Sequence, residues 1–463
     1  FIDWLQSAGQ TLWQTLPLGG IGPGNSPYMS SSAFAGNVLL IDLAELQQRG
    51  WLGADALAHP PAADPRHIDF ATMVPWRMAR LAEAARAFTS AATATDRADF
   101  AAFCAEHAGW LDDYALFMAQ CDATGWASWT TWPAALARRE PQALAEARVR
   151  HARAITFWQF CQWRFFRQWA ALRAHAHAQG VKIVGDAPIF IAHQSAEVWA
   201  RQDLFELDAA SNPTVVAGVP PDYFSATGQR WGNPLYRWSA HAAEGYAWWI
   251  DRIRATFALV DIVRIDHFRG FADYWEIPAD QPNAVHGRWL PGPGMALFKA
   301  IAHALGPLPV IAEDLGVITP DVEALRVEFG YPGMRYPGMQ QAAAQKPAVS
   351  RKAMPEFSKY QSQVLSFKDP DRYGYYGGTQ PGDVPLPASA DALRRMALAH
   401  FIDADIEAVA DRFHFRPEYA HLRRKFGGGA FFFARFAHQG GNLRRQPAHV
   451  APCLDRRLDH RAR

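Results

Sequence analysis

The sequence has almost no net charge, since its 463 residues include 46 lysines and arginines against 45 aspartates and glutamates. A chain with such balanced charge exerts no long-range attraction on a nucleic acid or an anionic membrane surface, so neither partner is expected. The sequence also lacks any run of about 18 consecutive apolar residues, which excludes a transmembrane helix. Its 49% hydrophobic and 20% charged residues exclude a disordered chain.

Cysteine is scarce as well. The four cysteines show no Cys-x-x-Cys spacing, which argues against a metal-binding or redox role. They are Cys104, Cys121, Cys161 and Cys453. No asparagine lies in an acceptor motif for N-glycosylation, so the expected location is a reducing cytoplasm. The chain begins at Phe1 with neither an initiator methionine nor a signal-peptide pattern, and we expect its natural sequence to begin earlier.

Aromatic residues, in contrast, are abundant, with 18 Trp, 13 Tyr and 29 Phe. Aromatic rings fill hydrophobic cores, but they also form flat platforms on which ring-shaped ligands stack. Those at helical spacing, such as Phe157, Trp158, Phe165 and Phe166, are expected in the core. The length is compatible with one large α/β barrel or with two to three smaller domains.

One structural unit recurs along the chain: an amphipathic helix, a glycine, a short apolar strand and a polar residue where the strand ends. Strands are expected at 11–16, 181–186, 259–266 and 308–313. Helices that alternate with strands predict a parallel sheet. Asp186, Asp266 and Glu313 end three of these strands, so they are expected at the carboxyl edge of the sheet. That edge carries the active site of an α/β barrel and the ligand site of a doubly wound sheet, and the pattern leaves both architectures open.

Three other segments differ from this unit. Residues 71–179 are strongly helical and rich in alanine, which predicts a helical insertion subdomain because the segment is too long for a barrel loop. Residues 211–240 are expected to form a long loop with little regular structure, and long ordered loops usually carry function. Beyond Tyr336 the recurring unit disappears and the chain ends in a basic tail.

Carboxylates gathered at one edge indicate acid/base or nucleophilic chemistry. Cleavage of a glycosidic bond requires such a set, because one carboxylate attacks the sugar and one carboxylic acid protonates the leaving oxygen. Arg264 lies on the same strand face as Asp266 and would keep that residue ionised, as a nucleophile requires. Glu313 follows three apolar residues, a setting that favours the protonated form an acid requires. The alternative is that Arg264 and Asp266 form only a structural ion pair at the rim of the sheet.

The segment 219–234 places aromatic side chains beside amides and an acid. Sugar-binding sites have this mixture, because the C–H faces of a sugar stack on rings while its hydroxyls form hydrogen bonds. The alternative is a packed Ω-loop whose aromatic residues bury one another. The glycine-rich run at 20–25 looks like a phosphate-binding loop, but no helix start follows it. A nucleotide-binding protein is therefore a weaker interpretation.

In combination, these residues resemble a known family, the 4-alpha-glucanotransferases (amylomaltases or disproportionating enzymes). This is glycoside hydrolase family seventy-seven, within the alpha-amylase superfamily. The resemblance covers about residues 1–335. Its most specific stretches are Trp-Gln-Thr-Leu-Pro-Leu at 13–18, Gly-Asn-Ser-Pro-Tyr at 24–28, Ser-Ala-Phe-Ala-Gly-Asn at 32–37, the segment 218–236, Val-Arg-Ile-Asp-His-Phe-Arg-Gly at 263–270 and Ile-Ala-Glu-Asp-Leu-Gly at 311–316. Each stretch alone could arise by chance, but their occurrence together and in this order is specific.

The resemblance implies a (β/α)8 TIM barrel over residues 1–463, N-terminally incomplete, with helical insertions. It implies transfer of alpha-1,4-glucan segments between maltooligosaccharides by a retaining double displacement. Asp266 matches the nucleophile, Glu313 the general acid/base and Arg264 the arginine beside the nucleophile. Substrate-binding residues are expected at Tyr28, Asp186, Asp222, Tyr223, Phe224, Gln229, Trp231, His267 and Asp314. No metal, organic cofactor or protein partner is expected.

The sequence also departs from the family. The family has a Gly-Thr-His-Asp-Asn-Asp run whose first Asp is the third catalytic carboxylate, yet the dipeptide His-Asp occurs nowhere in this chain. The nearest remnant places Asp383 as the candidate third carboxylate. Either residues 336–463 were read out of frame, or the protein has lost a transition-state group. We favour the first interpretation, because Arg264, Asp266 and Glu313 are intact. The competing functions are an alpha-glucan hydrolase of the same superfamily and a catalytically silent glucan-binding protein.

Overall fold

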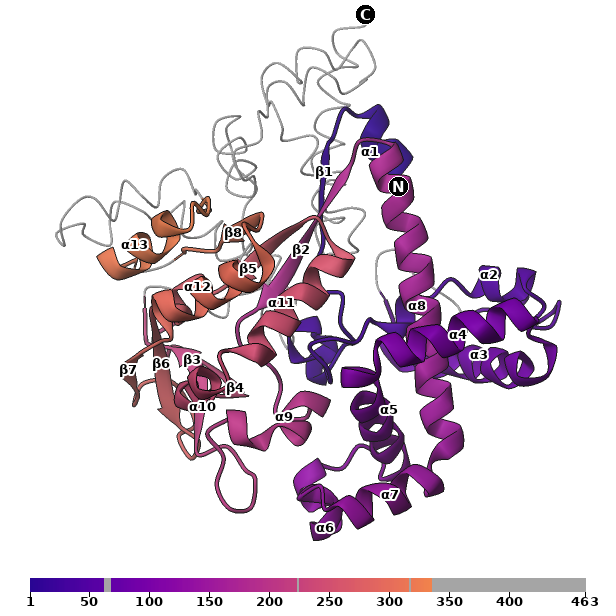
Figure 1. Ribbon diagram of the computed structural model, residues 1–463, viewed down its shortest axis with the longest axis horizontal. Coiled ribbons are helices and arrows are strands. Elements are labelled where there is room, and N and C mark those ends of the chain that lie inside the picture. Colours follow the sequence, from indigo (N-terminus) through magenta and orange to yellow (C-terminus); the bar gives the residue numbers. More distant parts are fainter. Residues whose placement is uncertain (62–67, 223–224, 316–317, 335–463) are drawn as a thin grey trace, which may run out of the picture.

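The computed structural model describes residues 1–61, 68–222, 225–315 and 318–334 (Figure 1). At its centre lies a four-stranded sheet in the order β1-β2-β5-β8, and every neighbouring pair of strands is parallel. The strands are β1 (Leu12–Gln14), β2 (Lys182–Pro188), β5 (Ile262–Asp266) and β8 (Val310–Ala312). The parallel sheet expected from the alternating helices and strands is confirmed.

Two of the helices that precede these strands end at a glycine, as the recurring unit predicts, whereas Leu259, expected to begin a strand, ends helix α11 (Ala247–Leu259). Helix α8 (Ala152–Ala178) ends just before Gly180, whose φ of 72° is left-handed, and β2 follows at once. Helix α12 (Gly294–Leu305) ends at Gly306, with a φ of 76°, before β8. Glycine adopts such angles without the clash that a Cβ would cause, so both positions end a helix sharply. Helix α11 leads into β5 in the same way but ends without a glycine.

A second sheet includes part of the segment 211–240, for which the sequence predicts a loop. Its strands are antiparallel, in the order β4-β3-β6-β7. They are β3 (Val215–Val219), β4 (Gln229–Pro234), β6 (Asp273–Pro278) and β7 (Arg288–Pro291). The expectation of little regular structure over 211–240 is therefore wrong. Strand β3 pairs with β6, which lies far along the chain, so its strand conformation depends on a partner that the local sequence does not reveal.

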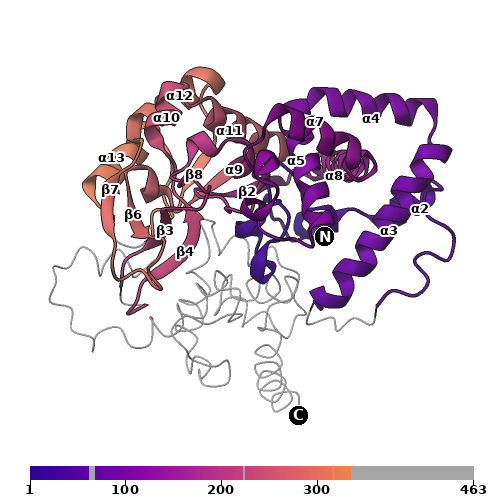
Figure 2. The ribbon, with the colours of Figure 1, turned by 90° about the horizontal axis from the view of Figure 1, so that it is seen from below.

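Helices dominate the region between β1 and β2. They are α2 (Leu43–Gln48), α3 (Phe70–Ala91), α4 (Ala94–Glu106), α5 (Ala108–Ala123), α6 (Ala134–Ala137), α7 (Pro141–Arg150) and α8. Figures 1 and 2 show most of them gathered on one side of the parallel sheet, with the second sheet and α12 on the other. The division of the chain into a barrel and an insertion at 71–179 stays a prediction. Residues 336–463, expected to complete the barrel, lie outside the described residues.

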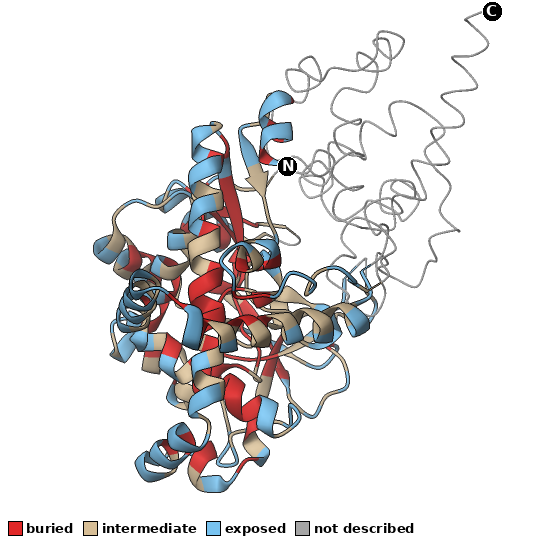
Figure 3. Ribbon diagram, turned by 90° about the vertical axis from the view of Figure 1, so that its right-hand side faces the viewer, coloured by how far each residue is buried: buried red, intermediate tan, exposed pale blue. Residues whose placement is uncertain are grey.

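The long helix α8 provides the core of this helical region. Trp158 and Phe165 are buried, and Phe157 and Phe166 pack against the same cluster, so these four aromatic residues lie in the core as expected. Figure 3 shows buried residues along the middle of the helices and strands and exposed residues at their ends and outer faces. None of the helices in the described ranges combines the length and apolarity needed to cross a membrane.

The remaining elements are short connections around the sheets. They are α1 (Ile2–Ser7), α9 (Ala196–Ala200), α10 (Trp238–Ala243), α13 (Pro320–Glu328) and the 3-10 turns Pro23–Asn25, Pro27–Met29, Val38–Leu40, Trp129–Thr131, Gln202–Leu204 and Phe268–Phe271. The last of these turns follows β5 directly and lies beside the carboxyl end of β8.

Candidate active site

Arg264 joins three carboxylates at the carboxyl edge of the parallel sheet. Its Nη1 donates to Oδ1 of Asp186 at 2.6 Å, and its Nη2 donates to Oδ1 of Asp266 at 2.8 Å. The same Nη2 lies 3.7 Å from Oε1 of Glu313. The strand register explains the cluster, because Asp186 on β2 is the direct partner of Arg264 on β5, and Glu313 follows β8 on the other side of β5. The structure thus brings together the three acids that the sequence placed at one edge.

The separation of Asp266 and Glu313 is limited by their shared contact. Because both oxygens approach the same Nη2 atom, at 2.8 and 3.7 Å, they lie no farther apart than 6.5 Å. Carboxyl groups about 5 to 5.5 Å apart are typical of retaining glycosidases, whereas those of inverting enzymes are about 6.5 to 9.5 Å apart. Two carboxylates this close can both reach one sugar ring.

The cluster has a consistent electrostatic pattern. Burial alone would lower the pKa of Arg264, but the carboxylates of Asp186, Asp266 and Glu313 raise it well above its usual value. Burial also raises the pKa of the Tyr28 hydroxyl, and the neighbouring Asp186 and Asp266 raise it further. Tyr28 is therefore neutral, and its hydroxyl donates a hydrogen bond to Oδ2 of Asp186 at 2.5 Å. A permanent cation beside a carboxyl group is the setting that a carboxylate nucleophile requires.

Glu313 has more polar surroundings than its sequence neighbours indicate. Its carboxylate Oε2 accepts the backbone N–H of His267 at 2.6 Å, while Oε1 faces Arg264. The apolar setting expected from residues 310–312 is wrong for the side chain. The reason is that residues 310–312 are buried within β8, whereas Glu313 lies beyond the strand and contacts the turn after β5.

Trp231 lies beside this turn, at the end of the second sheet. Its ring contacts the imidazole of His267 edge-on, with centroids 4.9 Å apart, and its Nε1 donates to Oε1 of Gln229 at 3.1 Å. Phe190, which follows β2, lies 6.3 Å from Trp231. Gln229 and Trp231 both belong to β4, so the antiparallel sheet brings the Trp231 ring to His267, the residue after Asp266.

Not all predicted site residues join the cluster. Asp222 is exposed, and its carboxylate accepts the backbone N–H of Ser225 at 2.8 Å. Asp314 forms an ion pair with Arg326 at 3.3 Å and accepts the backbone N–H of Met334 at 2.8 Å, so its described contacts brace the segment after β8. Tyr223, Phe224 and Asp383 lie outside the described residues. Within the described ranges, no three His, Cys, Asp or Glu side chains form a group that could hold a metal ion.

Comparison with known proteins identifies the family. A family model described as 4-alpha-glucanotransferase matches residues 1–367. The chain belongs to the 4-alpha-glucanotransferase family. Among its relatives, the 4-alpha-glucanotransferase of Thermus thermophilus is 52% identical over 335 residues, which are 72% of this chain and 66% of the relative. The Synechocystis enzyme is 47% identical over 338 residues, 72% of this chain and 67% of the relative. The matched region thus spans about two thirds of these relatives.

Solved structures agree with this family membership. An amylomaltase from Streptococcus agalactiae, determined in complex with acarbose, has a TM-score of 0.74 at 30% identity, covering 96% of this chain and 94% of that one. An amylomaltase from Corynebacterium glutamicum has a TM-score of 0.57 at 19% identity, covering 86% of this chain and 62% of that one, and it supports the fold alone. The fold is therefore the α/β barrel of the 4-alpha-glucanotransferase family, with β1, β2, β5 and β8 as four of its strands.

The structure also reveals residues at this site that the sequence did not indicate. A hollow lined by Tyr28, Asp186 and Phe190 reaches Arg252 on α11. The buried guanidinium of Arg252 donates to the carbonyl of Ile189 at 2.9 Å and also to that of Pro188, so it holds the chain just after β2. Arg252 lies next to the apolar face of its helix, and its charge gave it the sequence signature of a solvent-facing residue.

Proposed function

We propose that the protein is a 4-alpha-glucanotransferase that transfers alpha-1,4-glucan segments between maltooligosaccharides. The observation that carries the proposal is the contact of one buried arginine, Arg264, with Asp186, Asp266 and Glu313 at the carboxyl edge of the sheet. The names of the relatives, which match 72% of this chain, support the same activity.

The proposed reaction has two displacements. In the first, a carboxylate oxygen of Asp266 bonds to the anomeric carbon while the bond from that carbon to the glycosidic oxygen breaks. Glu313 gives its proton to the departing oxygen. In the second, the 4-hydroxyl of an acceptor glucan attacks the same carbon, Glu313 takes the hydroxyl proton, and Asp266 leaves. Both steps invert the anomeric centre, so the product retains the alpha configuration.

The other residues bind substrate in this proposal. Tyr28 and Asp186 lie beside the nucleophile, where a glucosyl residue would present its hydroxyls. Trp231 and His267 offer ring surfaces, and Gln229 orients the Trp231 indole. We also assign substrate contacts to Asp222, Tyr223, Phe224 and Asp314, and the role of third carboxylate to Asp383. The three free cysteines in the described part of the chain support a reducing cytoplasm as the location.

The test is the incubation of the intact protein with maltotriose. The proposal predicts glucose together with maltooligosaccharides longer than the donor, and Asp266→Asn should reduce their formation by at least about a thousandfold. Asp273→Asn is the matched control, because Asp273 also pairs with an arginine, Arg269, but lies outside the carboxylate cluster. Unchanged glucose release by Asp266→Asn would refute the assignment of the nucleophile.

The missing His-Asp dipeptide favours a second candidate, a catalytically silent glucan-binding protein. Such a protein would bind maltoheptaose but would form no new oligosaccharides. An alpha-glucan hydrolase would instead accumulate reducing ends without longer products. Sequencing of the 3′ end of the gene and the intact mass would determine whether residues 336–463 carry the missing run.

A further inference from the structure

Glu313 is hydrogen-bonded at three points to the end of β5 and the turn that follows it. Its backbone N–H donates to the carbonyl of Ile265 at 3.0 Å, and its own carbonyl accepts the N–H of Phe268 at 3.1 Å. Its carboxylate accepts the N–H of His267 at 2.6 Å. These partners lie on both sides of Asp266. Three backbone groups on either side of Asp266 therefore hold the proposed acid/base beside the proposed nucleophile.

The turn has this geometry because His267 adopts a left-handed conformation, with φ 55° and ψ 49°. Few residues other than glycine adopt this region, because the Cβ approaches the following carbonyl. A left-handed residue beside right-handed ones directs successive N–H groups toward the same side of the backbone, where they bind an anion or a carbonyl oxygen. The N–H groups of His267 and Phe268 both point at Glu313 in this way.

The surroundings of the imidazole hold the turn in place. The ring packs edge-on against Trp231. On another side lies Gly270, where a Cβ would come within 3.1 Å of Cδ2 of the imidazole. The side chain therefore occupies a confined space, which compensates for the unfavourable backbone angles.

We propose that His267 is a positioning residue that acts through its backbone: its left-handed conformation directs the N–H that fixes the Glu313 carboxylate relative to Asp266. This inference rests on the proposed function, in which Glu313 transfers the proton. It separates two roles of one residue, since the ring of His267 packs against Trp231 while its N–H serves the acid/base.

Four substitutions separate these roles, because all of them remove the imidazole and keep the N–H. They differ in how readily the residue adopts left-handed angles, in the order His267→Gly, His267→Asn, His267→Ala and His267→Val. Each variant is assayed with two donors. Maltotriose requires a proton from Glu313 as its glycosidic bond breaks, whereas alpha-maltotriosyl fluoride releases fluoride without one. The kcat/KM for fluoride release reports the attack by Asp266 alone.

The expected result is a graded loss with one donor only. On maltotriose, kcat/KM should fall from the Gly to the Val variant by about 10- to 100-fold, because a displaced acid loses part of its contribution. On the fluoride donor, the variants should agree within about threefold. In the second displacement Glu313 acts as the base, so the Val variant should release the glucosyl group from Asp266 slowly. Added azide attacks the glucosyl enzyme without needing a base and should restore this step with the fluoride donor. If the Val variant does not fold, the Gly, Asn and Ala variants still provide the ranking.

Two outcomes would overturn the inference. Equal rates among the variants on maltotriose would show that the backbone angle does not affect proton transfer. Parallel losses on both donors would show a general distortion of the site. Failure of the proposed function is distinguishable from both, because the unsubstituted protein would then fail to turn over maltotriose at all.

Discussion

The hydroxyl of Tyr28 donates to Oδ2 of Asp186, which lies 158 positions farther along the chain, while Oδ1 of the same carboxylate accepts from Arg264. Asp186 is therefore held from two sides. The loop that carries Tyr28 and the strand that carries Arg264 meet at this one side chain, so the shape of the cleft depends on it.

Replacement of Tyr28 by phenylalanine should lower kcat/KM on maltotriose by at least about tenfold. The ring would remain, but Asp186 would lose a hydrogen bond to a charged acceptor, a contact of about 1.5–3 kcal/mol. Steady-state kinetics would measure the change. Tyr274→Phe, which removes a hydroxyl from β6, is the control and should keep most of the activity. A Tyr28→Phe variant as active as the parent would contradict the role assigned to this bond.

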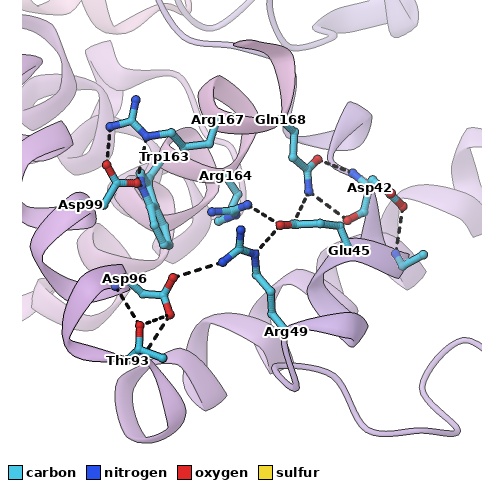
Figure 4. Close-up of polar contacts among 11 residues, drawn as sticks. Asp42, Glu45, Arg49, Thr93, Asp96, Asp99, Trp163, Arg164, Arg167 and Gln168 are labelled. Carbon is cyan, nitrogen blue, oxygen red and sulfur yellow. Dashed lines mark hydrogen bonds and ion pairs between the residues drawn. The ribbon is translucent and has the colours of Figure 1, made fainter. Parts of the chain in front are cut away.

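The ion-pair network between α2, α4 and α8 should contribute strongly to stability (Figure 4). Glu45 accepts from the buried Arg164 at 2.7 Å and from Gln168 at 2.7 Å. Glu45→Gln would leave the guanidinium without its carboxylate and should lower the free energy of unfolding by about 2–3 kcal/mol, reduced from the fully buried case because Glu45 is partly exposed. Glu140→Gln removes an exposed pair with Arg138 and should cost less than about 1 kcal/mol. Urea denaturation would compare them, and equal losses would rule out a special contribution of Glu45.

Glu197 on α9 should make stability depend on pH. Burial raises its pKa from 4.5 to about 6, although hydrogen bonds from Ser32 and the backbone of Ala33 oppose the rise. The folded state therefore binds the proton more tightly than the unfolded state. Its contribution to the free energy of unfolding is largest below pH 4.5 and is lost, by about 2 kcal/mol, as pH rises through 6.

The Glu197→Gln variant should lack this dependence. Urea denaturation at several pH values between 4.5 and 7 would compare its slope with that of the parent. Glu206→Gln removes a carboxylate paired with Arg237 at the surface and is the control. Identical slopes for the parent and Glu197→Gln would exclude titration of Glu197 in this range.

His241 should make the protein less stable as pH falls, which is the opposite of the effect of Glu197. It is fully buried among Tyr236, Trp238 and Trp248, and burial lowers its pKa from 6.5 to about 4, despite the nearby Glu244. The unfolded state then binds the proton more tightly, so up to about 3 kcal/mol of stability is lost as pH falls from 6.5 to 4. His241→Phe should flatten this acid limb, whereas exposed His303→Gln should leave it unchanged. Thermal denaturation across this pH range measures the difference, and an unaltered acid limb in His241→Phe would reject the prediction.

The parallel sheet and its acidic edge were predictable because each depends on local sequence. Glycines at 180 and 306 end helices, and apolar runs form β2 and β5. Asp266 ends β5, whereas β2 continues two residues beyond Asp186, to Pro188. Once the strands are parallel, their ends share one edge, so convergence of the carboxylates follows from the order of elements.

Features that depend on distant partners were not predictable. Strand β3 forms against β6, and Gly218 is required where a Cβ would overlap the backbone of Gln229. The left-handed conformation of His267 goes with a hydrogen bond from its N–H to Glu313, which lies 46 residues later. Nothing in the residues around 267 indicates this contact. The polar surroundings of Glu313 were not predictable either, because its apolar sequence neighbours do not indicate which turn its side chain faces.

The position of β1 also has a consequence for how the molecule folds. Thr15 at its end donates to the carbonyl of Val184, a residue 169 positions away, and the helices α3 to α8 fill the interval. Closure of so long a loop carries an entropic cost that local helix formation does not. We therefore expect α5 and α8 to become protected before β1 docks. Pulse-labelling hydrogen exchange would detect this order. Protection of the Thr15 amide before that of α5 and α8 would contradict the expectation.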